Sequence, residues 1–332
     1  MLKAIIFDMD TEMNLVKQHI PARERYHPLP GVPQILLKLT QEGIRLMMVS
    51  SFSQQEIREG CQAMKIQQYF QHLVSSDEAE HAKPAPDLLT LALQKSKVTQ
   101  REALVVADSY SGIKAAKAAA LPCIGFLHPH SENTDFSHAD ILLESFDGLS
   151  ISFFFHVHSR FHGQPITIAS TKRLWIRELA SENIPALCSI YQNPDIRRFL
   201  TELDDCVEDE AARQTAYINT VYPFYGYGLW GIFHKASGIL IGRCGIENQL
   251  ISGKEEIMLS YLLDRNYWGH GYALEACKAT LHYAREELDI HRIVAVIDCE
   301  NRRSLRTAAN LGMKPEQELI YKNRCCILFT LE

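Results

Sequence analysis

Two aspartates, Asp8 and Asp10, stand two residues apart near the start of the chain, directly after a short apolar run. Two carboxylates at this spacing can take separate roles in one reaction. One attacks an electrophile or binds a metal ion, while the other transfers protons. Such pairs are also common in turns, so the spacing alone is a weak indication. The apolar run reads as a buried strand, and we therefore expect both carboxylates where that strand ends.

Further polar residues follow the later apolar runs of the first half. Ser50 ends the second run, Asp108 follows another, and Lys83 opens a proline-containing segment between them. The runs are apolar throughout and alternate with helical patterns, which predicts an α/β domain with a doubly wound parallel sheet. Ligands of such sheets bind at the carboxyl ends of the strands. The expected strands are residues 3–8, 45–50, 103–107 and 122–126, and the expected helices are residues 32–42, 54–64, 87–95 and 112–120.

Together these residues resemble the four sequence motifs of the haloacid dehalogenase (HAD) superfamily, β-phosphoglucomutase-like branch, over about residues 1–147. The resemblance implies Mg²⁺-dependent hydrolysis of a small-molecule phosphate ester through an aspartyl-phosphate on Asp8, with Asp10 as general acid and base. It also implies that Ser50 and Lys83 hold the transferring phosphoryl oxygens, whose charge Lys83 neutralises. The metal ligands that it implies, all oxygen donors suited to Mg²⁺, are Asp8, Asp10 and Asp108.

Two positions depart from the pattern of that superfamily. Thr11 stands where its members usually have glycine, and Ala107 stands where this branch often has an acid. Losing one carboxylate weakens a metal site, which keeps open a second interpretation: a noncatalytic HAD-like domain for docking or dimerisation. Only residues 11–27 occupy the place of the usual cap. We therefore expect a capless domain whose open site takes a large substrate or is covered by a neighbouring domain.

The second half carries a different signal, in which Gly269 and Gly271 lie one residue apart before a helical pattern. Such glycines let backbone N–H groups turn toward an anion, and the following helix adds its N-terminal dipole. Residues 268–273 therefore predict a pyrophosphate cradle, with a tight turn as the alternative. Apolar positions after the loop repeat at intervals of 3 and 4, as in an amphipathic helix. The expected strands are residues 166–177, 228–233, 240–247, 257–263 and 293–299, which indicates a mixed α+β domain.

This loop resembles the acetyl-CoA loop of the GNAT N-acetyltransferase superfamily, in the branch that acetylates ribosomal-protein N-termini, over about residues 166–332. The opening segment 170–177 and the later Leu311-Gly-Met313 support the resemblance. It implies acetyl transfer from acetyl-CoA to an amine-bearing acceptor, with a splayed strand around residues 259–262. The cofactor-binding residues that it implies are Leu262, Asn266, Trp268, Gly269, His270, Gly271, Tyr272, Ala273, Asn301 and Ser304.

The proton acceptor of this second reaction is poorly defined by the sequence. The glutamate frequent in the superfamily aligns with Met258, and its frequent tyrosine acid falls near Ala308. Glu256, two residues before Met258 on the same strand face, is our candidate general base, acting through water. A solvated edge carboxylate is the alternative, and positioning alone can also drive the reaction because effective molarities are large.

Composition limits the remaining possibilities. A chain of 332 residues exceeds one ordinary core, so we expect domains at residues 1–150 and 166–332 with a linker at 151–165. With a net charge of −6, the chain lacks the excess of basic residues that is typical of nucleic-acid-binding proteins. No apolar run is long enough for a membrane span. Nine cysteines without a Cys-x-x-Cys pair, and no signal-peptide pattern, favour reduced thiols in a cytoplasmic protein. The oligomeric state is left open.

Overall fold

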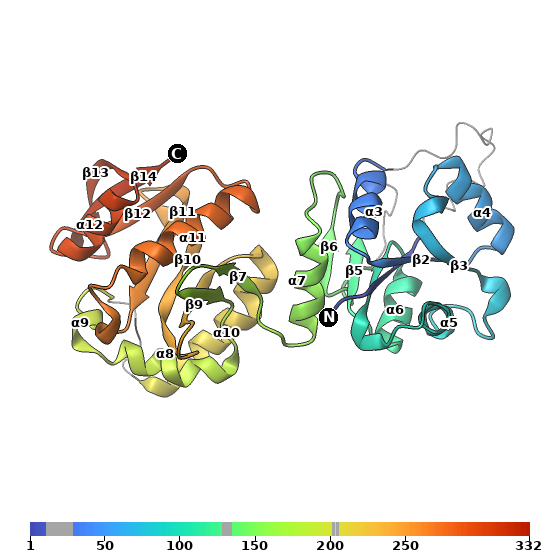
Figure 1. The fold of residues 1–332 in the computed structure, drawn as a ribbon, viewed down its shortest axis with the longest axis horizontal. Helices are drawn as coiled ribbons and strands as arrows, with labels where there is room; N and C mark the ends of the chain where they lie inside the picture. Colours follow the sequence, from blue (N-terminus) through green and yellow to red (C-terminus); the bar gives the residue numbers. More distant parts are fainter. Residues whose placement is uncertain (11–28, 128–134, 201–202, 204–205) are drawn as a thin grey trace. The chain divides into compact units, whose positions relative to one another are not determined.

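The computed structural model describes residues 1–10, 29–127, 135–200, 203 and 206–332. Its internal contacts divide the chain into two compact units, residues 1–164 and 165–332 (Figure 1). Each unit has its own sheet and apolar core, so each is described by itself. The predicted replacement of a cap by residues 11–27 lies outside the described residues.

The first unit contains a six-stranded sheet in which every neighbouring pair is parallel, as the sequence predicted. The strand order is β3-β2-β1-β4-β5-β6, so the order reverses between β1 and β4. A crevice outside the carboxyl ends of the strands is the usual ligand site at such a switch point. The strands are β1 (Ala4–Asp8), β2 (Arg45–Val49), β3 (Phe70–Val74), β4 (Ala103–Ala107), β5 (Cys123–Phe126) and β6 (Ile141–Leu143).

Helices cover both faces of this sheet, because alternate strand residues point to opposite sides. Ile5 and Phe7 pack in one apolar cluster with residues of α3, α4 and α7, whereas Ile6 packs in another with α5 and α6. The helices are α3 (Val32–Gln41), α4 (Gln54–Ala63), α5 (Asp87–Ser96), α6 (Tyr110–Ala118) and α7 (Ser152–Phe161). Short 3₁₀ turns are η2 (Gln67–Tyr69), η3 (Ser76–Glu78) and η4 (Gln100–Glu102).

The last helix of this unit, α7, occupies most of the segment predicted as a linker, residues 151–165. Phe154 is fully buried and Val157 nearly so, and both belong to the core cluster that contains β1. His158 Nε2 lies 2.8 Å from the carbonyl oxygen of Arg101, which connects the helix to the turn before β4. Residues 152–161 are therefore part of the first unit. This segment forms a helix with one buried face, because its buried residues Phe154, Val157 and His158 are three and four positions apart.

The second unit contains an eight-stranded sheet in the order β13-β14-β12-β11-β10-β9-β8-β7. Its pairs are antiparallel except for β11 and β12, which run parallel. The predicted long strand 166–177 is instead a hairpin, because the Thr171 amide donates to the Leu174 carbonyl and closes a turn. The strands are β7 (Thr167–Ser170), β8 (Leu174–Arg177), β9 (Leu229–His234), β10 (Leu240–Ile251), β11 (Lys254–Leu263), β12 (Ile293–Asp298), β13 (Lys314–Tyr321) and β14 (Arg324–Leu331).

The two faces of this sheet pack against different helices. On β10, Arg243 lies over the ring of Tyr191 in α8, while its neighbour Cys244 contacts Cys277 in α11. The predicted amphipathic helix is α11, whose buried side includes Leu281. The helices are α8 (Ile184–Tyr191), α9 (Pro194–Arg197), α10 (Val207–Tyr225), α11 (Tyr272–Glu286) and α12 (Arg302–Asn310), with the turns η5 (Ser181–Asn183) and η6 (Arg265–Tyr267).

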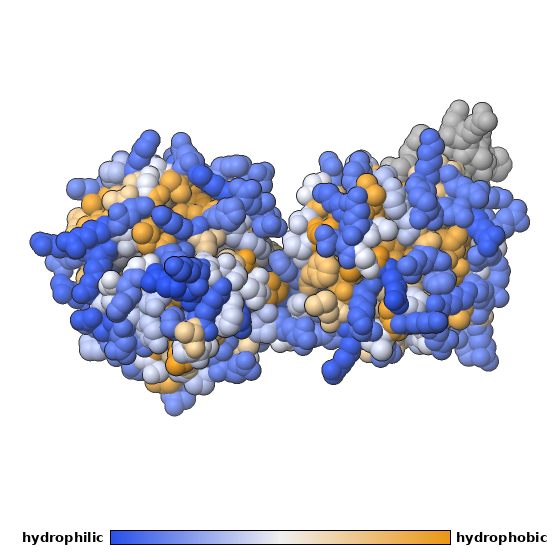
Figure 2. Space-filling model, in the orientation of Figure 1, coloured by the Kyte–Doolittle hydropathy of each residue, from blue (hydrophilic) through white to orange (hydrophobic). Residues whose placement is uncertain are grey.

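Hydrophilic side chains cover much of the visible surface of each unit, with separate apolar patches between them (Figure 2). In the portion of the chain that the structure describes, no helix combines the length and the apolar composition that crossing a bilayer requires.

Candidate active sites

The carboxylates of the first unit lie at the carboxyl ends of neighbouring strands, where the sequence placed them. Asp8 is the last residue of β1, Ser50 follows β2, and Asp108 follows β4. The Asp108 amide donates to the Asp8 carbonyl at 3.2 Å, and both side chains are fully buried. This is the point at which the strand order reverses between β1 and β4, so the sheet topology itself gathers these residues.

The Asp10 side chain is held by a dense set of donors. The Ser50 hydroxyl and the Ser51 amide both donate to Oδ1 at 2.8 Å, and the Ser51 hydroxyl donates to Oδ2 at 2.8 Å. Lys83 Nζ also donates to Oδ2, at 2.9 Å. Burial opposes ionisation, but Lys83 and these hydrogen bonds outweigh it and lower the pKa of Asp10. The role of Ser51 was missed, although its position beside Ser50 was a signal.

Lys83 connects the two aspartates. Its side chain is only 2% exposed, and Nζ forms ion pairs with Oδ1 of Asp8 and Oδ2 of Asp10. Burial favours the neutral amine, yet the two carboxylates outweigh it and raise the pKa of Lys83. The residue therefore remains a buried ammonium ion between two carboxylates, which suits it to attract a phosphoryl group.

Asp8 differs from Asp10 in its electrostatics. Burial raises the pKa of Asp8 to about 7, against the pull of Lys83 and with reinforcement from Asp10 and Asp108. Its second oxygen, Oδ2, is buried and has no hydrogen-bond partner among the described residues. A Cβ at Gly112 would lie 2.8 Å from that oxygen, so the glycine leaves it room. The site thus contains one buried carboxylate oxygen without a donor.

That oxygen is the main indication of a metal ion. Within the described part of the chain, no three acidic, histidine or cysteine side chains converge as a ready metal site. Serines and Lys83 donate to both side-chain oxygens of Asp10, and its role as a metal ligand stays a prediction. Asp8 Oδ2 is a buried oxygen without a donor among the described residues, and the buried Asp108 carboxylate accepts from the Asp10 amide at 2.9 Å through Oδ1. The site thus combines three carboxylates with the buried ammonium ion of Lys83. The charge and the oxygen donors fit a hard divalent cation such as Mg²⁺.

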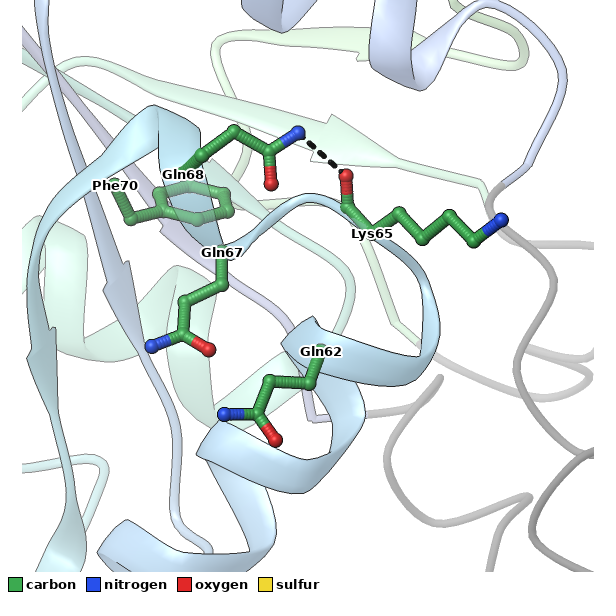
Figure 3. Close-up of a pocket in the computed structure, with 5 residues that line it drawn as sticks. All are labelled: Gln62, Lys65, Gln67, Gln68 and Phe70. Atoms are coloured by element: carbon green, nitrogen blue, oxygen red, sulfur yellow. Dashed lines mark hydrogen bonds between the residues drawn. The ribbon is translucent and has the colours of Figure 1, made fainter.

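A surface hollow of this unit is separate from the carboxylates. It has a volume of about 520 Å³ and lies between the end of α4 and the start of β3 (Figure 3). The Gln68 side chain donates to the Lys65 carbonyl at 2.7 Å across it. The hollow has no carboxylate or nucleophile and takes no part in the site; its lining residues are Gln62, Lys65, Gln67, Gln68 and Phe70.

The candidate site of the second unit begins where two strands separate. Among the described residues, the parallel strands β11 and β12 pair at one position, Met258 with Val294. Beyond it, β11 continues to pair with β10 as far as Leu263. The backbone of residues 259–262 is therefore released on its β12 side, which is the splay that the sequence predicted. Unpaired backbone groups at such an opening can bind an extended ligand.

The glycine loop follows directly after β11 and leads into α11. Gly269 and Gly271 have φ values of 81° and 78°, a left-handed backbone that favours glycine. Gly271 is the N-cap of α11, and no described side chain caps the first turn of that helix. Its amide groups are therefore available to an anion, with the helix dipole added.

Other residues fasten this loop in place. Trp268 Nε1 donates to the Leu263 carbonyl at 2.7 Å, which joins the loop to the end of β11. Arg173 Nη1 donates to the His270 carbonyl at 2.9 Å, and its guanidinium lies 4.2 Å from the centre of the Tyr272 ring. Glu275 accepts from Arg173 Nε at 2.6 Å. This clamp has no local signal in the sequence, because its partners Arg173 and Glu275 are 102 residues apart.

The remaining predicted cofactor residues lie around the same loop. Leu262 ends the released strand segment, Ala273 lies in the first turn of α11, and the Asn266 amide donates to Asp264. Asn301 caps α12, since its Oδ1 accepts from the Ser304 amide at 3.2 Å. Arg303, in that helix, lies 4.5 Å from the centre of the Trp268 ring. The start of α12 therefore borders the loop, and a ligand role for Asn301 stays a prediction.

Glu256 does not fit the role of general base that the sequence suggested. Its two oxygens accept from Nε and Nη2 of Arg292, each at 3.0 Å. Arg292 also contacts Glu316 and Thr330, so the pair belongs to an ion network at the beginning of β11. A carboxylate held by a two-pronged guanidinium is a poor proton acceptor. These contacts argue against Glu256 as the base, and its assignment stays a prediction.

A different carboxylate stands beside the opening. Glu247 on β10 pairs with Met258, the last residue at which β11 and β12 are joined. Its Oε1 accepts from the Tyr217 hydroxyl at 2.8 Å, and that hydroxyl accepts from the Leu229 amide at 2.8 Å. Burial, reinforced by Glu247, raises the pKa of Tyr217, so the phenol stays protonated and donates. The sequence carries no signal for Glu247 beyond its place at the end of the expected strand 240–247.

Comparison with known families agrees with this division. A family model described as a haloacid dehalogenase-like hydrolase matches residues 7–126, and one described as an acetyltransferase (GNAT) domain matches residues 173–314. The uncharacterized protein YkkB of Bacillus subtilis is 31% identical over 124 residues, which are 37% of this chain and 71% of that protein. Protein CbbY of Cereibacter sphaeroides is 33% identical over 123 residues, 35% of this chain. The chain spans about half of the length of CbbY (52%).

A solved structure of a putative GnaT-family acetyltransferase from Bordetella pertussis is also similar. It is 19% identical, and the match covers 51% of this chain and 99% of that chain with a TM-score of 0.44.

Proposed function

Since the chain belongs to the HAD-like hydrolases through its first unit and to the GNAT acetyltransferases through its second, we propose that it is a bifunctional enzyme. The first unit hydrolyses a small-molecule phosphate ester with Mg²⁺, and the second acetylates an amine from acetyl-CoA.

The observation that carries the acetyltransferase proposal is the position of the glycine loop at the end of the released strand. The bond from Trp268 Nε1 to the Leu263 carbonyl joins the loop before α11 to the end of β11, which supports an anion site beside the opening between β11 and β12. The loop would hold a pyrophosphate, and the opened strand would hold the arm that leads to the thioester. Acetyl-CoA supplies the activated acetyl group.

Glu247 is the proposed proton acceptor in this reaction. Neighbouring strands lie about 4.8 Å apart, so a β10 residue level with Met258 is about one strand spacing from the apex of the opening. The Tyr217 hydroxyl holds one oxygen of the carboxylate, which leaves the other to take a proton from the attacking amine. Protonated Tyr217 thereby fixes the orientation of the base.

Acetyl-CoA binding tests the loop. Replacing Gly271 with valine adds a branched side chain at a left-handed position in front of the α11 amides, and we expect calorimetric titration to show no binding. Gly253→Val is the matched control, because Gly253 has a φ of 81° in the turn between β10 and β11. Both glycines have an uncrowded Cβ position, so strain should be similar. Full binding by Gly271→Val, or equal losses in both variants, would contradict the assignment.

The phosphatase proposal rests on the arrangement of Asp8, Lys83 and Asp10 at one sheet edge. Asp8 is the proposed nucleophile, and Lys83 and Ser50 would hold the phosphoryl oxygens. Asp8 Oδ2 and Asp108 would hold Mg²⁺, which supplies positive charge for the phosphoryl transfer. A cation at Oδ2 would favour the ionised form of Asp8 that attack requires. Asp10 would transfer the proton of the leaving group and then of the attacking water.

Phosphate release from p-nitrophenyl phosphate, with Mg²⁺ and with a chelator, tests this half. We expect Mg²⁺-dependent turnover in the wild type and none in Asp8→Asn, with acetyl-CoA binding unchanged as the control. Ala107 supports the competing interpretation, a noncatalytic docking or dimerisation domain. A wild type that hydrolyses no member of a broad panel of phosphate esters with Mg²⁺ would establish that interpretation instead.

A further inference from the structure

Two cysteines of the second unit face each other outside both candidate sites. The sulfur atoms of Cys299 and Cys325 are 3.1 Å apart, and the Cys299 amide donates to the Cys325 carbonyl at 3.1 Å. The pair continues the antiparallel register of β12 and β14, in which Asp298 is opposite Cys326. Cys325 is exposed and Cys299 is partly exposed, so reagents in solution can reach them.

We propose that Cys299 and Cys325 are a modification site at which oxidation forms a reversible disulfide bond within one chain. Directly opposite residues of an antiparallel pair that share a backbone hydrogen bond have Cα atoms about 5.5 Å apart. A disulfide accepts Cα separations of about 4.4–6.8 Å, so the backbone needs no rearrangement. Opposite residues also project from the same face of the sheet, which directs both sulfur atoms to one side.

A second close pair of cysteines in the same unit shows that exposure, and not proximity alone, determines which thiols an oxidant reaches. The sulfur atoms of Cys244 and Cys277 are 3.8 Å apart, but both residues are fully buried between β10 and α11. Oxidants reach exposed thiols first. Proximity is therefore shared by the two pairs, while access distinguishes Cys299 and Cys325.

The chemistry requires a two-electron oxidant, for which we name a peroxide. The first thiol attacks a peroxide oxygen, the O–O bond breaks, and a sulfenic acid forms with release of one water. The second thiol then attacks the sulfenic sulfur, the S–S bond forms, and a second water leaves. Two thiols are thus oxidised and one hydrogen peroxide is reduced to two waters. The hydrogen bond with Cys325 raises the pKa of Cys299 to about 11, which lowers the thiolate fraction of Cys299 and leaves the first attack to the more exposed Cys325.

The bond would act on the start of α12. Cys299 lies two residues before Asn301, the N-cap of that helix, and the neighbouring Asp298 is already ion-paired with Arg324 at 2.6 Å. A disulfide would close a loop of 27 residues and fasten the segment between β12 and α12 to β14. By loop-closure entropy we expect the thermal midpoint of this unit to rise by at least about 5 °C.

Thiol counting with peptide mapping tests the proposal on the full chain. After treatment with hydrogen peroxide and then denaturation, we expect seven of the nine thiols to react with a labelling reagent, and dithiothreitol to restore nine. Mass spectrometry of a non-reduced digest should then identify a peptide linked through Cys299 and Cys325. Either Cys299→Ser or Cys325→Ser should abolish the loss of two thiols, whereas Cys206→Ser, at an exposed cysteine of the same unit, should preserve it.

Other outcomes would overturn the proposal. They are nine thiols after peroxide treatment, separate sulfinic acids on the two residues, a link through Cys326 instead, or a disulfide between two chains, which doubles the mass on a non-reducing gel. None of these outcomes depends on acetyl-CoA binding or phosphatase activity, so the proposal stands or fails independently of the proposed function.

Discussion

Replacing Asp8 with asparagine should stabilise the first unit of the metal-free protein above neutral pH, although it removes the proposed nucleophile. Burial raises the pKa of Asp8 from 3.8 to about 7, so the folded protein holds a proton that the unfolded chain releases. Well below pH 3.8 the carboxyl is protonated in both states and has no effect. Between pH 4 and 7 the free energy of unfolding falls as pH rises, because unfolding then releases a proton.

The size of the expected stability difference follows from the same shift of the Asp8 pKa. A shift from 3.8 to about 7 corresponds to about 4 kcal/mol at pH 8, at about 1.4 kcal/mol for each pH unit. Asparagine is a neutral side chain of the same shape and resembles the protonated aspartic acid. We therefore expect the stability difference between Asp8→Asn and wild type to be small at pH 4 and to approach about 4 kcal/mol at pH 8.

Urea unfolding in a chelator at several pH values measures this difference. Far-UV circular dichroism follows both units, whereas fluorescence follows only the second, because all three tryptophans lie there, at positions 175, 230 and 268. The fluorescence transition is thus an internal control that should not move. Asp147→Asn, at an exposed carboxylate of the same unit, is the matched variant and should leave stability unchanged at every pH.

The prediction also has a clear contrary result. A stability difference that stays constant from pH 4 to pH 8, or an asparagine variant less stable than wild type at pH 8, would refute the electrostatic reasoning. Saturating Mg²⁺ should reverse the order at pH 8, since a cation beside Oδ2 stabilises the ionised wild type and not the amide.

Two further pairs of substitutions test the second site and the first core. Glu247→Gln should lower kcat/KM by about 10²–10⁴-fold with short free-amine peptides as acceptors, while leaving acetyl-CoA binding intact. Glu256→Gln should leave kcat/KM near wild type and instead lower the thermal midpoint, because Arg292 loses a two-oxygen partner; the opposite order would restore Glu256 as the base. Phe154→Ala should destabilise the first unit by about 3–5 kcal/mol in urea, whereas Phe161→Ala, at a side chain 39% exposed, should cost far less. Equal losses of stability in the two variants would mean that α7 is not part of the core of the first unit.

Local patterns in the sequence were sufficient for the architecture of both units and the location of both sites. Short apolar runs predicted the parallel strands, and polar residues after them predicted the sheet edge at which Asp8, Ser50 and Asp108 meet. Likewise, two glycines before an amphipathic helix predicted the loop in front of α11. These signals are local because strand ends, turns and helix starts depend on residues that are adjacent in the chain.

The chemical role of each site side chain depends on contacts between residues that are distant in the sequence, and only the tertiary structure reveals those contacts. Glu256 and Glu247 are similar strand carboxylates in the sequence, yet Arg292, 36 residues away, neutralises the first, and Tyr217, 30 residues away, orients the second. In the first unit, Asp8 and Asp10 differ because Ser51, 41 residues from Asp10, supplies donors to one carboxylate and none to the other. Charge and proton affinity depend on burial and on partners, and no spacing along the chain encodes either.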